Sequence, residues 1–447
     1  SPLVPVLKKC GSIRWATDFR MVNRCIEPDA YPLPNITDTL NKLAGARIFS
    51  SLDAAQAYHT IKMSRRSRKV TAICTPMGLY EFLRMPFGLS VSGAVYSRYV
   101  ALAMDGVNPN NQVCYLDDIL VYSAKATEHL QHLEEAFKAH RAAGLKLKAS
   151  KTHLFQEEVI FLGHLVTKDG LRMAPDYLAK ISEWPVPKTV KELNTTLGFF
   201  SYYRSFIVNY SLYTTEMDRQ KKAKKLEWTP VMDQKFKELK EAFQRAKVRG
   251  YPQYHSKEKF RLTTDYSHHG LSAVLSQMQA GKERMLCAAS RKCTKFEANY
   301  SSCKGEMAAC MYGLRKFRHM LLMRPFLLFT DSQALKYLHN LKEPRGIWMR
   351  WLEEMAAFQM EVQHKPGRIN LNADGLSRTP AMMQEPTQSE KDEEKEFIGA
   401  ILDQDLSREQ LKKEQEKDPV LKKVRSWMLK GAPSRTEMKG ESLEVHM

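Results

Sequence analysis

The chain has 447 residues, of which 43% are hydrophobic and 27% are charged. This composition can bury ordinary cores and so excludes a disordered protein, and the sequence contains no apolar run of the roughly eighteen residues that a membrane-spanning helix needs. The 69 lysines and arginines outnumber the 50 aspartates and glutamates, giving a formal net charge of +19, which favours a polyanionic partner because neutralised phosphates release counterions.

The eight cysteines are scattered along the chain without any CxxC pair. Zinc sites and disulfide frameworks need closer, paired spacing, so the pattern indicates reduced thiols in an intracellular protein. The first residues, SPLVPVLKKCGSIRW, lack the basic and then apolar order of a signal peptide. They start within a strand-like run, so we expect a segment of a longer polypeptide.

Residues 1–170 alternate short β-like runs, such as 46–52 and 113–122, with helical stretches such as 129–143. Alternation of this kind predicts an α/β or α+β domain.

The remainder of the chain changes character three times. Residues 175–248 are mainly helical, with a proline-rich break at 184–187. Residues 260–378 return to alternating strands and helices and predict a second α/β domain. An acidic, polar linker follows, and a helical pattern resumes at 398–429.

Three aspartates interrupt strand-like runs in the first domain. Asp117 and Asp118 lie in the middle of YLDDILVYS, and Asp53 ends the run ARIFSSLD. An ordinary role is open for each of them, because Asp also favours hairpin turns and helix N-caps. Adjacent carboxylates, however, repel each other unless a cation neutralises them. An aspartate at a strand end and an aspartate pair on a hairpin can together hold two hard divalent cations, as in-line nucleotidyl transfer requires.

Six blocks of the sequence, in order, resemble the gypsy-type reverse transcriptases of LTR-retrotransposon Pol polyproteins. The blocks are TDFRMVN (17–23), YPLPNITDTLNKLAGARIFSSLDAAQAYHTI (31–61), MPFGLSVSGAVYSRY (85–99), YLDDILVYS (115–123), GLKLKASKTHLF (144–155) and FLGHLVTKDGL (161–171). The resemblance implies a right-hand polymerase of fingers, palm and thumb. It also implies that Asp53 and Asp117 hold two Mg²⁺ ions, for which Mn²⁺ can substitute, and that Asp118 supports them.

Further residues acquire roles from the same resemblance. Tyr58 matches the aromatic gate that excludes a ribose 2′-hydroxyl, with core packing as the alternative. Phe87 and Gly88 match the dNTP pocket, where a glycine lets the backbone approach the substrate. Arg14 matches an arginine that grips the triphosphate. Lys151 matches a lysine that donates a proton to pyrophosphate.

Four carboxylates lie on strand and helix patterns between 260 and 378. They are Asp265 at the end of a predicted strand, Glu306 on a predicted helix, Asp331 at a strand end before a helix, and Asp374 late in the domain. Singly, each of them suits an ordinary surface or helix-cap position. Together they resemble the ribonuclease H constellation, which also includes the TDSQ sequence at 330–333. The resemblance implies that they hold two further Mg²⁺ ions and that His364 is a mobile histidine that transfers protons.

We therefore predict an α/β and α+β multidomain fold, a right-hand polymerase followed by an RNase H-like domain. The predicted segments are N-terminally truncated fingers and palm (1–174), a helical thumb and linker (175–255), a ribonuclease H domain (256–380), and an acidic linker with a helical connector toward an integrase (381–447).

The expected function is RNA- and DNA-directed DNA synthesis with cleavage of the RNA strand of a hybrid. The expected partners are an RNA template, a DNA primer, an RNA–DNA hybrid and dNTPs, with no membrane, and a homodimer is left open. The expected location is the cytoplasm, in a virus-like particle, and the nucleus with the cDNA product. The alternative is a domesticated or truncated, catalytically weak protein that binds nucleic acid or serves assembly.

Overall fold

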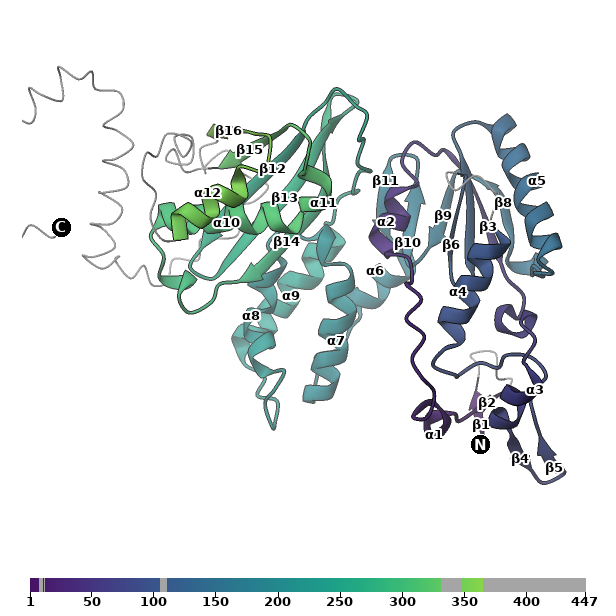
Figure 1. Cartoon of the computed structure of the whole chain (residues 1–447). Helices are drawn as coiled ribbons and strands as arrows, with labels where there is room; N and C mark the ends of the chain where they lie inside the picture. Colours follow the sequence, from purple (N-terminus) through teal and green to yellow (C-terminus); the bar gives the residue numbers. More distant parts are fainter. Residues whose placement is uncertain (8–10, 12, 105–110, 331–346, 365–447) are drawn as a thin grey trace, which may run out of the picture. The chain divides into compact units, whose positions relative to one another are not determined.

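A computed structural model of the chain describes residues 1–7, 11, 13–104, 111–330 and 347–364 (Figure 1). The chain divides into two compact units. The first comprises Ser1–Lys259 and Leu275–Ala288, and the second comprises Phe260–Val274 and the chain from Ala289 onward. The predicted acidic linker and C-terminal helical connector lie outside the described residues.

The first unit begins with two small antiparallel hairpins. One joins β1 (Leu3–Leu7) to β2 (Ile13–Thr17), and the other joins β4 (Ile73–Thr75) to β5 (Gly78–Tyr80). The short helices nearby in the sequence are α1 (Arg20–Asn23), α2 (Ile36–Asn41) and α3 (Arg65–Arg68).

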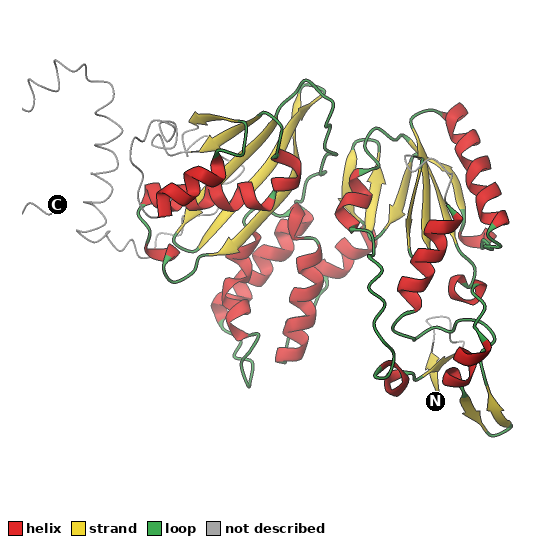
Figure 2. Ribbon diagram, viewed as in Figure 1, coloured by secondary structure: helices red, strands yellow, loops and turns green. Residues whose placement is uncertain are grey.

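A four-stranded antiparallel sheet follows, in the order β6-β7-β3-β8 (Figure 2). Its strands are β3 (Ile48–Asp53), β6 (Gln112–Tyr115), β7 (Asp118–Ser123) and β8 (His153–Gln156). Helices α4 (Ser92–Ala103) and α5 (Ala126–Ala142) flank the sheet.

The sheet buries both of its faces, as the run of apolar residues in β7 requires. Ile119 and Val121 pack with Leu133 of α5, whereas Leu120 and Tyr122 point into a separate core. Side chains two apart share a face of a strand, so β7 supplies alternate residues to each core.

Strands β9 (Glu158–Phe161), β10 (His164–Thr167) and β11 (Gly170–Met173) form a three-stranded antiparallel sheet. Four helices follow: α6 (Pro175–Ser182), α7 (Val190–Tyr202), α8 (Tyr210–Gln220) and α9 (Pro230–Gln244). Thr189 and Thr229 cap α7 and α9 by accepting hydrogen bonds from backbone N–H groups of the first turn. Buried ring contacts of Phe200 with Phe236 and Phe243 join α7 to α9.

A five-stranded sheet follows in the chain, in the order β14-β13-β12-β15-β16 (Figure 1), and the second unit contains β12, β15, β16 and the parts of β13 and β14 outside Leu275–Ala288. Its strands are β12 (Phe260–Ser267), β13 (Gly270–Gln279), β14 (Lys282–Lys292), β15 (Phe326–Thr330) and β16 (Met360–His364). Strands β12, β15 and β16 are parallel to one another. The helices are α10 (Ser302–Lys316), α11 (Arg318–Leu321) and α12 (Ile347–Met355).

The predicted mixture of α/β and α+β segments is confirmed, and the segment predicted to be helical contains α6 to α9. The predicted boundaries at 174 and 255 stay predictions. Across the described ranges, no helix combines the length and the apolar character needed to cross a bilayer.

Three histidines, His129, His140 and His164, are buried within the first unit, and none of them has a carboxylate partner among the described residues. His129 is fully buried, and its ring nitrogens lie 2.7 Å from Ser50 Oγ and 2.8 Å from Ser123 Oγ. His164 stacks on Phe206 and hydrogen-bonds through Nδ1 to the Leu162 carbonyl. Burial lowers the pKa of His129 and of His164 to about 4 and also lowers the pKa of His140, because the charged form loses its hydration.

We predict that the first unit loses stability as the pH falls from about 6.5 to about 4. All three histidines have lowered pKa values when folded, so the unfolded chain binds more protons in this range. Each can contribute up to about 1.4 kcal/mol per pH unit. Urea unfolding of the protein at successive pH values measures the slope.

His164→Phe keeps the aromatic contact with Phe206 and should make that slope shallower. An identical slope in this variant would show that His164 is not one of the groups responsible.

Candidate active sites

The register of two central strands places two of the predicted aspartates opposite each other. Asp53 is the last residue of β3, Asp118 is the first residue of β7, and the two are direct antiparallel partners. Opposed residues in such a pair have Cβ atoms roughly 4.5–5.5 Å apart. The helix-capping alternative for Asp53 is wrong, because the next helical turn (Ala57–Thr60) has Gln56 as its N-cap residue.

The third aspartate lies in the loop of the hairpin that joins β6 to β7. Leu116 and Asp117 connect Tyr115 to Asp118, and Leu116 has a φ of +53°. Asp117 accepts a backbone hydrogen bond from Ala54 N at 3.4 Å, which links the loop to the residue after Asp53. YLDDILVYS is therefore a hairpin rather than one strand. The hairpin turn that was the alternative to metal binding for Asp117 and Asp118 is present. This turn also brings the two carboxylates close to Asp53.

Electrostatic repulsion is evident in this group. The pKa of the Asp118 carboxyl is raised, first by desolvation and then by the negative charges of Asp117 and Asp53, while Lys151 acts in the opposite direction. Asp118 as a residue is exposed, so we give more weight to the like charges than to burial. A cation bound among these carboxylates would cancel that repulsion.

Lys151 already supplies one positive charge. It ends a single helical turn (Ala149–Lys151), and its Nζ lies 2.9 Å from Asp53 Oδ2. The backbone N–H of Lys148 also donates to the Asp53 carbonyl at 2.9 Å. The pKa of Lys151 is raised, first by its hydrogen bond with Asp53. The resemblance pointed to Lys151 as a proton donor, and its pairing with Asp53 was not predicted.

The donor chemistry of this group fits Mg²⁺, which prefers carboxylate oxygens. The geometry is not that of a formed cage, since among the described residues no three His, Cys, Asp or Glu side chains are grouped closely enough to hold an ion. Lys151 Nζ already pairs with one of the two carboxylate oxygens of Asp53.

An aromatic cluster borders the aspartates. The ring of Tyr58 meets Phe87 edge-on at 5.0 Å and Tyr96 at 5.4 Å. Desolvation raises the pKa of Tyr58, and the nearby charge of Asp117 adds to this shift. Gly88, which follows Phe87, has a φ of +97°, a conformation that favours glycine. The Tyr58 ring thus packs against other aromatic rings and also lies close to Asp117. These contacts are compatible with both the nucleotide gate and the core-packing role.

Two carboxylates of the second group lie on adjoining elements. Asp265 is the sixth residue of β12, which continues to Ser267 instead of ending at Asp265 as predicted. Glu306 lies on α10 as predicted, but it is only 3% exposed and is not an ordinary solvated residue. Its Oε1 accepts a hydrogen bond from the backbone N–H of Tyr266 at 3.1 Å.

The close approach of α10 to β12 depends on glycine. A Cβ on Gly305 would lie 2.2 Å from ring atoms of Tyr266, and one on Gly313 would lie 3.2 Å from Thr264 Cγ2. These two glycines let the helix seat Glu306 beside the strand that carries Asp265. Neither glycine was predicted to matter, although Gly305, next to Glu306 inside a predicted helix, was a usable signal in the sequence.

Two of the remaining predicted site residues lie on described strands, and two lie outside the described residues. Arg14 lies on β2, and His364 is the last residue of β16. Asp331 and Asp374 lie outside the described residues.

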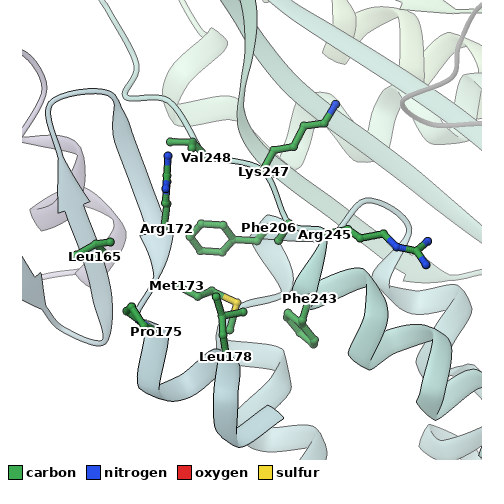
Figure 3. A pocket seen from close by; sticks show the side chains of 11 residues that line it. Leu165, Arg172, Met173, Pro175, Leu178, Phe206, Phe243, Arg245, Lys247 and Val248 are labelled. Atoms are coloured by element: carbon green, nitrogen blue, oxygen red, sulfur yellow. The ribbon is translucent and has the colours of Figure 1, made fainter. Parts of the chain in front are cut away.

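A separate cavity of about 590 Å³ contains none of the predicted site residues (Figure 3). Its floor includes Met173, Leu178 and Phe206, and Arg172 and Lys247 reach its edge. It is a groove among β11, α6 and α9, away from the aspartates.

Two segments of the chain match the models of known protein families. Residues 6–166 match the family described as reverse transcriptase (RNA-dependent DNA polymerase). Residues 255–358 match the RNase H-like domain found in reverse transcriptase.

Curated relatives match most of the chain. It is 36% identical over 383 residues to the retrovirus-related Pol polyprotein from transposon 297 of Drosophila melanogaster, covering 84% of this chain and 35% of that protein. It is 32% identical over 383 residues to the transposon Tf2-7 polyprotein of Schizosaccharomyces pombe, covering 84% and 29%. The chain thus spans about a third of the length of these relatives.

Solved structures share the fold. A foamy viral protease-reverse transcriptase in complex with double-stranded DNA matches with a TM-score of 0.73 and 22% identity, covering 81% of this chain and 65% of that one. The foamy viral protease-reverse transcriptase in complex with an RNA/DNA hybrid matches with a TM-score of 0.66 and 22% identity, covering 86% and 52%.

We predict that Gly305→Ala destabilises the second unit by about 1–3 kcal/mol, because the new methyl group collides with Tyr266. Gly198→Ala on α7 is a matched control, since a Cβ there meets nothing within 4 Å. It should instead stabilise the protein by about 0.5–1 kcal/mol. Chemical unfolding of both variants measures the difference. A neutral Gly305→Ala would mean that α10 can lie farther from β12.

Proposed function

Because the chain belongs to the reverse transcriptase family of LTR-retrotransposon Pol polyproteins, we propose that it copies RNA and DNA templates into DNA and cleaves the RNA of the resulting hybrid. The observation that carries the proposal is the opposition of Asp53 and Asp118 across β3 and β7, with Asp117 in the hairpin loop beside them. Double-stranded DNA and RNA/DNA hybrid are bound by foamy viral neighbours in the fold, and we propose the same partners here, together with dNTPs.

The three aspartates are the proposed ligands of two Mg²⁺ ions at the polymerase site. Bound Mg²⁺ supplies Lewis acidity toward a primer 3′-hydroxyl and a departing pyrophosphate. The strand register holds Asp53 and Asp118 face to face before substrate arrives, so little reorganisation is needed. Lys151 keeps a positive charge 2.9 Å from Asp53, and its flexible side chain can turn from this carboxylate toward phosphate oxygens, where it can donate a proton.

Substrate selection is proposed to depend on the aromatic cluster. Phe87 and Tyr96 hold the ring of Tyr58 edge-on from two sides. A ring fixed in this way can exclude a ribose 2′-hydroxyl without losing side-chain entropy on each encounter. Gly88 provides backbone that a nucleotide can approach closely, and Arg14 is the proposed triphosphate ligand.

RNA cleavage is proposed at a second, separate site. Asp265 and Glu306, with Asp331 and Asp374, are the proposed ligands of two further Mg²⁺ ions. Glu306 is held by the Tyr266 N–H and by the close seating of α10, so its position is set by the fold and not by the metal alone. His364, at the end of β16, is the proposed proton-transferring group.

Asp117→Asn is predicted to abolish primer extension on poly(rA)·oligo(dT) in magnesium, because it removes charge from the metal ligands while preserving side-chain size. Cleavage of RNA in a hybrid by the same preparation should persist. Glu135→Gln, on the exposed face of α5, is the control and should retain both activities. Simultaneous loss of both activities in Asp117→Asn would contradict the two-site proposal.

Glu306→Gln is predicted to eliminate cleavage of a labelled RNA strand while extension on a DNA template continues. The amide can still accept the Tyr266 N–H, so the fold is kept while metal affinity drops. Glu353→Gln, at an exposed position of α12, should cleave at the parental rate. Parental cleavage by Glu306→Gln would remove Glu306 from the site, and loss of extension as well would favour a weakly active assembly protein.

A further inference from the structure

The backbone that carries Tyr58 is a single 3₁₀ turn, Ala57–Thr60. Hydrogen bonds in a 3₁₀ turn have poorer geometry than those in an α-helix, and one isolated turn does not offset the entropy lost in forming it. The turn also starts at Gln56, whose φ of +52° lies in the left-handed region that is uncommon outside glycine. Contacts from another segment must therefore hold this turn in place.

Arg84 supplies such contacts through its side chain. Its Nη1 donates to the His59 carbonyl at 3.0 Å and to the Thr60 carbonyl at 2.8 Å. Both carbonyls lie at the end of the turn, where a helical turn offers no partner of its own. One guanidinium nitrogen carries two N–H groups and stays charged, so it can serve both oxygens with charge-assisted hydrogen bonds.

The backbone joins the same two segments. Lys62 and Arg84 form an isolated antiparallel bridge, and the N–H of Met85 donates to the Ile61 carbonyl at 3.0 Å. The Arg84 side chain thus reaches the turn from a backbone that is already fixed beside it. Little conformational entropy remains to be lost when its hydrogen bonds form.

The segment after Arg84 carries an aromatic partner of Tyr58. Phe87 lies three residues after Arg84, and its ring meets Tyr58 at 5.0 Å and His59 edge-on at 5.4 Å. The pKa of His59 is lowered, first by desolvation and then by the positive charge of Arg84. Arg84 therefore holds the backbone of the turn, while Phe87 meets two of its rings. The Tyr58 ring stays against Phe87 only as long as the turn stays in place.

We propose that Arg84 is a positioning residue, which fixes the Tyr58 ring and so sets how strongly the polymerase site rejects a ribose 2′-hydroxyl. A turn without the two Arg84 hydrogen bonds lets the ring move away from Phe87, and the space that opens admits the hydroxyl. The effect on nucleotide choice rests on the proposed polymerase function, but the effect of Arg84 on the turn does not.

The first test compares a dNTP with the matching rNTP in single-nucleotide extension, with kcat and KM measured separately. Arg84→Met keeps the length of the side chain and removes its charge and donors. The dNTP:rNTP ratio of kcat/KM should fall at least about fivefold, as loss of about one hydrogen bond implies. Arg141→Met, at the exposed end of α5, is the matched control and should keep the parental ratio. A parental ratio in Arg84→Met, or an equal loss for both nucleotides, would overturn the proposal.

A double variant tests whether Arg84 acts through the ring. Tyr58→Val removes the ring and should lower the dNTP:rNTP ratio by itself. Arg84→Met added to Tyr58→Val should lower the ratio no further, because residues that act through one contact are not additive. A further fall would show that Arg84 acts on the substrate directly and would overturn its positioning role. A parental ratio in Tyr58→Val would remove the gate, and the inference with it.

Hydrogen exchange of the full chain measures the turn without any polymerase activity. Peptides that cover 57–63 should exchange faster in Arg84→Met than in the parent or in Arg141→Met, while peptides from α5 exchange alike in all three. Unchanged exchange at 57–63 would overturn the role of Arg84. Faster exchange there, in a protein whose parent never extends a primer, would fail the proposed function and leave the role of Arg84 in the turn standing.

Arg84 is exposed, so the fold should survive its replacement. If Arg84→Met nevertheless unfolds, Arg84→Lys keeps one charged donor and is measured in the same two assays. It should change the ratio and the exchange in the same direction by smaller factors. Parental values in both assays would overturn the need for a guanidinium.

Discussion

Repulsion between carboxylates at the end of a sheet is the constraint on which the first unit of the molecule depends. Asp53 and Asp118 are forced together by the register of β3 and β7, and that register is set by apolar side chains that alternate between two cores. A slip by one residue would move each set of apolar residues into the core that the other set fills. Burial of the strands therefore stabilises an arrangement of charges that would otherwise separate, and Lys151 offsets part of the cost.

In the second unit, a helix and a strand, instead of two strands, hold the carboxylates of the proposed site. Glu306 is nearly fully buried, and a buried carboxylate is costly unless it is paired or hydrogen-bonded. The N–H of Tyr266 supplies one such bond, and Gly305 allows the approach that makes it possible. In both units, local backbone geometry holds acidic groups in place independently of any bound ion.

Much of the arrangement of strands and helices that carry the carboxylates can be predicted from the sequence. Strand ends and helix positions follow from short-range periodicity, so the strand ending at Asp53 and the helix carrying Glu306 were predicted correctly. The pairing of Lys151 with Asp53 spans 98 positions, and no local pattern encodes it. The extension of β12 past Asp265 was missed because Tyr266 and Ser267 suit a turn as well as a strand. The left-handed Leu116 was missed because leucine rarely takes that conformation.

The strand order β6-β7-β3-β8 determines which part of the sheet unfolds first. The two strands that bear Asp53 and Asp118 are the interior strands of their sheet, hydrogen-bonded on both sides, whereas β6 and β8 lie at its edges. Edge strands fray at low free-energy cost, while interior strands separate only when the whole unit opens. The opposed carboxylates thus lie at the ends of the two strands that the sheet holds from both sides. Loss of an edge strand leaves β3 paired with β7, so Asp53 and Asp118 stay opposite each other until these two strands separate.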